Sequence, residues 1–380
     1  MASSLFIVGI KSAMLEVQTY QQYILRKKTM NKITTIGLDT AKSIFHIIAC
    51  NTHGKIVLKK TLRRKQLLEY FANLESCLVG LEACSNSHHW GRELIKLGHT
   101  VKLIPAQHVK PYLQGNKNDY NDALAIAKAV VHPQMRFVAI KTIAQQDQGL
   151  ISHKRQEVID ARTQLVNRIR AMLCERGIVI NKGITSFKRA LPAFIENADR
   201  LLSDGFVCIL SQDYHYLQQL DEHLAVYDKQ IKIITTQSDH CRRLIAIPGF
   251  GPISATAFSS HIGDGQQFSK GRDASASLGV VPAQHSSGGK HKLLGISKRG
   301  NCRLRSLIIH GARSVVSNIS DKQDPLSKWL RQLVLRVGIH KATVAYANKM
   351  IRMGWAVTRF GTPYDPDHAV KFNLQNAQTA

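Results

Sequence analysis

The hydrophobic pattern changes its period near residue 145, and this change limits the folds that the chain can adopt. Between Ile33 and Val131, short β-rich runs come first and then alternate with helix-like segments, which predicts a mixed α/β sheet. Beyond it, apolar residues recur at helical spacing over long stretches. We therefore expect an α/β domain over 31–144, a helical linker over 145–240 and a mainly α-helical domain over 241–360.

The two ends of the chain do not fit this pattern. Met30 stands directly before the first convincing strand, so we interpret residues 1–30 as a non-conforming N-terminal extension. Residues 361–380 form a polar tail to which we assign no role.

The first region has signals for a meander followed by alternating helices and strands. Two β-rich runs flank the turn cluster Asn51–Gly54, which predicts a hairpin, and a third run continues from Lys55 to Leu62. The later elements are then expected as a helix over 65–74, a strand over 77–81, a helix over 89–97, a strand over 100–104 and a helix over 119–131.

A heptad pattern marks the second region. Its apolar positions, spaced alternately by three and four residues, are Leu217, Leu220, Leu224, Tyr227, Ile231 and Ile234. An earlier stripe holds Leu165, Ile169 and Met172. Two interpretations stay open: two helices packing on each other within one chain, or a coiled coil between two copies.

The charge balance points to an anionic partner. The chain has 52 Lys and Arg against 26 Asp and Glu, a net charge of +26 and a pI near 10.0, which favours nucleic acid through counterion release. Seven scattered cysteines without a CxxC pair argue against a zinc knuckle or a disulfide framework and fit a reducing cytoplasm. No apolar run approaches the roughly 18–20 residues of a membrane span.

Four carboxylates stand at positions suited to metal binding. Asp39 lies within the first predicted strand, Glu82 closes the fourth, and Asp119 and Asp122 lie three residues apart on one face of a predicted helix start. Each alone is open to a structural interpretation, such as helix capping for the aspartate pair. Together they predict a site for divalent cations, Mg²⁺ or Mn²⁺, that clamps a phosphodiester.

Two glycine-containing segments of the third region suggest contacts with phosphate. Gly249 and Gly251 lie in a Pro-Gly-x-Gly turn between two helical stretches, which resembles a helix-hairpin-helix. From Ser286 to Arg313 there are seven Lys and Arg and no acidic residue. The candidate nucleic-acid contacts there are Ser286, Gly288, Lys290, Lys298, Arg299, Arg303 and Arg305. Chemistry alone favours serines that only donate hydrogen bonds to phosphate.

Several motifs, in order across about Ile33 to Arg359, resemble the insertion sequence 110/1111 transposase family, relatives of the Piv-type DNA invertases. They are IGLDTAK, the Glu of GLEAC, KNDYNDALAIA, PGFGPISA, LGVVPAQHSSGGKHKLLGISKRGN and ANKMIRMGWAV. The resemblance implies an RNase H-like, RuvC-type N-terminal domain, a helical linker and a C-terminal transposase domain with a nucleophilic serine. Its DEDD tetrad falls on Asp39, Glu82, Asp119 and Asp122. Its serine falls within 285–288, and we choose Ser287 over Ser286.

The same resemblance implies the partners. They are double-stranded DNA at the element ends and at the target, a structured guide RNA encoded by the element, and further copies of the chain in a dimer or tetramer. We also expect the protein in the cytoplasm, at the nucleoid, in keeping with its scattered cysteines. Two other functions compete with serine-and-metal recombination: hydrolysis of DNA by the metal site alone, and nucleic-acid binding without catalysis.

Overall fold

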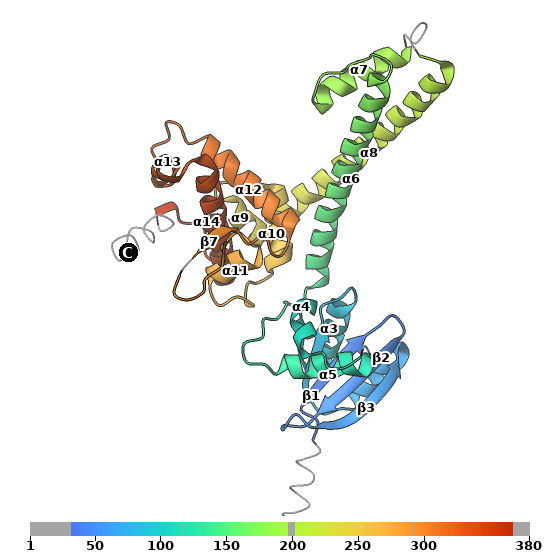
Figure 1. Cartoon of the computed structure of the whole chain (residues 1–380), viewed down its shortest axis with the longest axis vertical. Helices are drawn as coiled ribbons and strands as arrows, with labels where there is room; N and C mark the ends of the chain where they lie inside the picture. The colour runs from blue at the N-terminus through green and yellow to red at the C-terminus, as the bar shows by residue number, and fades with distance from the viewer. Residues whose placement is uncertain (1–31, 117, 197–201, 291, 368–380) are drawn as a thin grey trace, which may run out of the picture. The chain divides into compact units, whose positions relative to one another are not determined.

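The computed structural model describes residues 32–116, 118–196, 202–290 and 292–367 (Figure 1). The chain divides between Thr142 and Ile143 into two compact units. The expected extension over 1–30 and the last part of the expected tail, 368–380, lie outside the described residues.

The first unit is built on a five-stranded sheet with the order β3-β2-β1-β4-β5. Its strands are β1 (Thr35–Thr40), β2 (Ile44–Cys50), β3 (Ile56–Arg63), β4 (Leu78–Glu82) and β5 (Thr100–Ile104). β1, β2 and β3 pair antiparallel, whereas β4 and β5 run parallel to β1. The expected mixed sheet, a meander followed by helix–strand alternation, is confirmed.

Helices cover both faces of this sheet. On one face, Ile36 and Leu38 of β1 share a core with Phe71 of α2 (Leu67–Ala72) and with residues of α3 (Ser87–Lys96). The other face packs against α5 (Asp119–Val130). Three short elements connect these in the chain: η1 (Arg64–Gln66) joins β3 to α2, and α4 (Ala106–Val109) and η2 (Lys110–Tyr112) come between β5 and α5.

Two glycines bring α5 close to the sheet. An added Cβ on Gly37 of β1 would lie 2.6 Å from the backbone nitrogen of Ala127, and one on Gly80 of β4 would lie 2.8 Å from Cβ of Val130. Since side chains alternate between the faces of a strand, Asp39 and Glu82, two positions after these glycines, also face α5.

The second unit begins with a long helical hairpin, in which α6 (Ile143–Cys174) packs along α8 (Asp204–Gln237) (Figure 1). Ion pairs set an antiparallel register: Arg155–Asp228 at 2.6 Å, Arg162–Asp221 at 3.0 Å and Arg168–Asp213 at 3.1 Å. Leu217 and Leu220 of the heptad seam share a core with Leu165 and Ile169 of α6, and with Phe187 of α7 (Ile184–Glu196). These seam positions are therefore used for packing within the chain.

The rest of the second unit is mainly helical, with one small hairpin of β6 and β7. Its elements are α9 (Asp239–Ile245), α10 (Pro252–Ile262), α11 (Gly271–Ser277), β6 (Pro282–Gln284), β7 (Leu293–Ile296), α12 (Cys302–Ser317), α13 (Pro325–Val337) and α14 (Ile339–Phe360). α14 supplies the fully buried Tyr346 and Met350 to the core. No helix in the described part of the chain has the length and hydropathy to cross a membrane.

Candidate functional site

The strand register places the first two carboxylates side by side. Leu38 of β1 pairs with Leu81 of the parallel strand β4, so Asp39 and Glu82 follow at neighbouring positions at the carboxyl ends of the strands. Both residues lie two positions beyond a glycine that faces α5, so their side chains project from the α5 face of the sheet.

The first turn of α5 carries the other two carboxylates, Asp119 and Asp122. The side chain that caps this helix is Asn118, which accepts a hydrogen bond from the backbone N–H of Tyr120 at 2.9 Å. Capping by a side chain is therefore performed by the preceding residue, and the two aspartates are available to the cluster with Asp39 and Glu82.

Burial and mutual repulsion shape the electrostatics of this cluster. The pKa of Asp39 is raised to about 6, first by loss of solvent and then by repulsion from the carboxylates of Asp122, Asp119 and Glu82, whereas His46 acts in the opposite direction. Burial, followed by repulsion from Asp122, also raises the pKa of Glu82, and Lys110 offsets part of this effect. A bound cation would relieve this repulsion.

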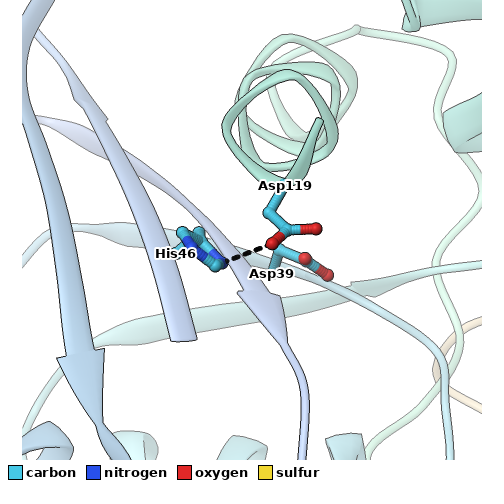
Figure 2. A group of neighbouring side chains, drawn as sticks. All are labelled: Asp39, His46 and Asp119. Carbon is cyan, nitrogen blue, oxygen red and sulfur yellow. Dashed lines mark ion pairs between the residues drawn. The ribbon is translucent and has the colours of Figure 1, made fainter. Parts of the chain in front are cut away.

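An imidazole joins the acidic cluster from the second strand (Figure 2). His46 is the antiparallel partner of Asp39, and its Nδ1 lies 3.5 Å from Oδ2 of Asp119. The ring of Tyr120 meets His46 edge to face, with centroids 5.1 Å apart, and the Tyr120 hydroxyl lies 2.8 Å from Oγ1 of Thr61. These contacts hold the imidazole toward the acids.

The donor atoms of Asp39, His46 and Asp119 suit a single divalent cation. One ligand atom from each residue lies within 4.8 Å of the other two. Ligands of one ion at about 2.0–2.2 Å from it lie roughly 3–4 Å apart, so atoms separated by as much as 4.8 Å must approach each other by about 1 Å or more to bind the same ion. Oxygen donors alone suit Mg²⁺, and a nitrogen donor adds affinity for transition metals such as Mn²⁺.

Sequence reasoning missed His46. His46 lies on the same face of the strand as Ile44 and Ile48. A polar residue on the face of the buried Ile48 was the sequence pattern that could have identified it. Its closeness to Asp39 depends on the hairpin register, which the residue pattern alone leaves open.

The serine pair lies at the end of the β6–β7 hairpin. Gly288 and Gly289, with φ of 55° and 75°, turn the chain there. The Ser286 hydroxyl accepts hydrogen bonds from Nε2 of Gln284 at 2.9 Å and from the backbone N–H of Lys292 at 3.3 Å. The backbone carbonyl of Ser287 accepts from the N–H of Lys290 at 3.1 Å, but its exposed hydroxyl has no partner among the described residues.

A second loop, which follows β7, is held tightly beside this hairpin. Lys298 has a φ of 54°, a left-handed conformation that costs energy for a residue with a side chain. Its backbone N–H donates to the carbonyl of Gly279 at 3.0 Å. The guanidinium of Arg305 donates to the carbonyls of Leu278 at 3.1 Å and Arg299 at 2.7 Å, so Arg305 supports the loop.

The remaining predicted contacts are spread over the second unit. Arg303 lies 4.0 Å from the carboxylate of Asp160 on α6. In the turn between α9 and α10, Gly249 has a φ of 95°, a conformation that favours glycine, and an added Cβ on it would lie 2.8 Å from Cε of Met350. The Cβ direction of Gly251 is open. The four acids belong to the first unit, and all the other predicted site residues belong to the second.

Two family models match the chain. Residues 36–176 match a DEDD transposase model of the IS110 type, and residues 241–326 match the model described as transposase IS116/IS110/IS902 family. The first range includes the four acids, and the second includes the serine hairpin.

Curated relatives match nearly the whole chain. The transposase for insertion sequence element IS1111A of Coxiella burnetii is 39% identical over 87% of this chain and 91% of its own length. A probable family 20 transposase of Pseudomonas aeruginosa is 39% identical over 88% of this chain and 99% of its own length. The transposase for insertion sequence element IS1328 of Yersinia enterocolitica is 35% identical over the same two shares, 88% and 99%.

Proposed function

The chain belongs to the IS110/IS1111 family of transposases, enzymes that cut and rejoin DNA, and we propose that it does so with a metal site of four acids and a serine nucleophile. The observation that carries the proposal is the convergence of Asp39, Glu82, Asp119 and Asp122 at one end of the sheet. In a chain with a net charge of +26, this grouping needs an explanation, and metal binding supplies one.

The four acids hold the metal, Mg²⁺ or Mn²⁺. When bound, it polarises the phosphorus and offsets charge that develops on the phosphate oxygens. Asp39 and Glu82 come from the rigid sheet, while Asp119 and Asp122 come from a helix that is packed against that sheet through Gly37 and Gly80. This support keeps the carboxylates oriented before DNA arrives.

Ser287 performs the covalent step. Its Oγ attacks phosphorus and forms a phosphoserine bond, while the bond from phosphorus to one deoxyribose oxygen breaks and that oxygen leaves as a hydroxyl. The proton of Ser287 passes to solvent, and a proton is taken up by the leaving oxygen. The reverse reaction with the hydroxyl of a new partner strand rejoins DNA and frees the serine, so no external energy source is needed.

The hydrogen bonds of the hairpin favour Ser287 over its neighbour. The Ser286 hydroxyl accepts two hydrogen bonds that close the hairpin, whereas Ser287 stands at the exposed turn beside Gly288. Lys290, Lys298 and Arg299 lie in the same hairpin and the loop beside it, where they would bind the phosphates of the strand.

The proposal includes partners that follow from the family resemblance. DNA at the element ends and target is the substrate, a structured guide RNA selects it, and a dimer or tetramer performs the exchange in the cytoplasm, at the nucleoid. The turn containing Gly249 and Gly251 would add contacts to the DNA backbone in the manner of a helix-hairpin-helix.

The test is a denaturing gel of the full chain with end-labelled element DNA, its RNA and Mg²⁺. Wild type is expected to form a protein–DNA adduct that protease removes, and Ser287→Ala is expected to form none. Ser286→Ala is the matched control: it loses hydrogen bonds worth about 0.5–1.5 kcal/mol each but keeps the nucleophile, so its adduct persists.

Two outcomes would overturn parts of the proposal. Free cleaved DNA from both wild type and Ser287→Ala would mean that the acids direct hydrolysis by water without the serine. An adduct retained in Ser287→Ala and lost in Ser286→Ala would move the nucleophile to the neighbouring residue. Asp39→Asn is expected to abolish cleavage while leaving DNA binding intact.

A further inference from the structure

Three cations gather where α11 packs on α14. Arg272 is the second residue of α11, while Lys349 and Arg352 stand three residues apart on α14 and therefore lie on one side of that helix. The helices are close here because Gly271 has no side chain: an added Cβ on it would lie 3.3 Å from Cβ and 3.4 Å from Cα of Arg352.

These cations have no acidic partner in the described part of the chain. No carboxylate there forms an ion pair with Arg272, Lys349 or Arg352. Asp273, next to Arg272 in sequence, instead accepts a hydrogen bond from the hydroxyl of Ser269 at 2.8 Å. The ammonium of Lys349 lies 4.9 Å from the ring centroid of Trp329 on α13, a contact that supplies weak compensation.

Partial burial makes this arrangement costly without an anion. Burial, with a smaller contribution from Arg352, lowers the pKa of Lys349 to about 8. Burial, and then repulsion from Arg272, lowers the pKa of Arg352. The free protein is therefore destabilised by holding like charges together, and an anion bound between them would remove this cost.

The cation group is joined to the serine region through α11. At the far end of this helix, Ser277 and Leu278 contact the loop that carries Arg299: an added Cβ on Gly300 would overlap the carbonyl oxygen of Ser277, and Arg305 bonds the carbonyls of Leu278 and Arg299. Seven helical residues span about 10 Å. At about 3.4 Å of axial rise per nucleotide in one strand, this length corresponds to roughly three nucleotides.

We propose that Arg272, Lys349 and Arg352 bind the phosphate backbone of duplex DNA a few nucleotides from the phosphate that Ser287 attacks. The inference rests on the proposed function for one part, the position of the site relative to the phosphate that Ser287 attacks. Binding of the DNA backbone by the three cations does not depend on the serine. The two arginines offer planar groups that match phosphate oxygens, and Lys349 adds a point charge. This phosphate site would keep the strand in place during cutting and rejoining.

The test measures the salt dependence of binding of the full chain to element-end duplex DNA. Each phosphate contact contributes about 0.9 to the slope of log affinity against log salt concentration. Arg272→Gln and Arg352→Gln are each expected to lower the slope by about 1, and the double variant by about 2. Lys341→Gln is the matched control, since it removes an exposed charge from α14 about 16 Å along the helix from Arg352 and should leave the slope unchanged.

A second measurement separates binding from a structural role. Because the free protein holds three cations together, Arg272→Gln and Arg352→Gln are expected to keep or raise the thermal midpoint of the DNA-free protein. Lys349 should react with an amine-selective reagent near pH 8, and duplex DNA should protect it. An unchanged salt slope, or a lowered thermal midpoint in both variants, would overturn the proposal.

Separate variants distinguish failure of this phosphate-site proposal from failure of the proposed serine mechanism. Ser287→Ala tests the covalent step and should keep the full salt slope, whereas the arginine variants should form adduct at raised DNA concentration. Binding to a structured RNA is measured in parallel. A loss of slope for RNA alone, with duplex DNA unaffected, would assign the site to RNA and contradict the proposal.

Discussion

Gly37 faces Ala127 across the contact between β1 and α5, and an added Cβ on the glycine would lie 2.6 Å from the backbone nitrogen of the alanine. The same added atom would overlap the carbonyl oxygen of Ala123. Backbone atoms cannot move aside as a flexible side chain can. The distance between Asp39 on the strand and the two aspartates at the start of α5 is therefore determined by the absence of a side chain at residue 37.

Gly37→Ala is expected to push α5 away from the sheet and to separate the proposed metal ligands. Overpacking of this kind costs about 1–3 kcal/mol of unfolding free energy, and divalent cation affinity should fall with it. Chemical denaturation and a metal titration measure the two effects. Gly205→Ala is the control, because an added Cβ there meets nothing within 4 Å and should leave stability and metal affinity near wild type.

The raised pKa of Asp39 predicts how the metal-free protein responds to pH. Its carboxyl has an ordinary pKa of 3.8 and a pKa of about 6 in the fold. Below pH 3.8 it is protonated in both states, and between about 4 and 6 the unfolded chain ionises first. Stability of the metal-free protein should therefore decrease as pH rises through this window.

Metal binding should show the opposite dependence on pH. A cation binds the ionised carboxylate, so affinity for Mg²⁺ should fall as pH drops below about 6, with protons released on binding. Calorimetric titrations in buffers of different ionisation enthalpy count these protons. In Asp39→Asn the proton release at pH 6 should decrease, and an undiminished release would assign it to another group.

His46 is expected to tune the choice of metal. Its Nδ1 lies 3.5 Å from the Asp119 carboxylate, so a bound ion would gain a nitrogen donor that favours Mn²⁺ over Mg²⁺. His46→Ala should weaken Mn²⁺ binding by about 10–100-fold and Mg²⁺ binding less. Nitrogen coupling in the electron spin resonance of bound Mn²⁺ reports the contact directly. The control is His53→Ala, in the exposed turn between β2 and β3, which should change the affinity for neither Mn²⁺ nor Mg²⁺. If His46→Ala lowered both affinities equally, His46 would not be a ligand.

Lys298 combines a backbone strain with a charge, and two substitutions separate them. Lys298→Gly relieves the left-handed conformation at φ 54° and should stabilise the protein by up to about 1 kcal/mol relative to Lys298→Ala. Both remove the charge and should lower the salt slope of DNA binding by about 1. If only Lys298→Ala weakened binding, the loop conformation rather than the charge would be responsible.

Much of the local structure follows from spacing along the chain. The alternation through Ile36 and Leu38 predicts a strand with one apolar face, and Asp119 and Asp122 must share one side of any helix that includes both. The mixed sheet and the later helices were predicted on the same grounds. The family could also be recognised, because its motifs are short segments that occur in a fixed order along the sequence and can be identified without knowledge of the fold.

Residue spacing determined that strands, helices and an acidic set exist, because those patterns repeat over distances that one element spans. Tertiary structure decided which side chains meet. His46 joins Asp39 through strand register, and Ser286 differs from Ser287 through two hydrogen bonds across a hairpin. The cation group on α11 and α14 joins residues far apart in sequence. Such contacts depend on how the whole core packs, and no local pattern carries that information.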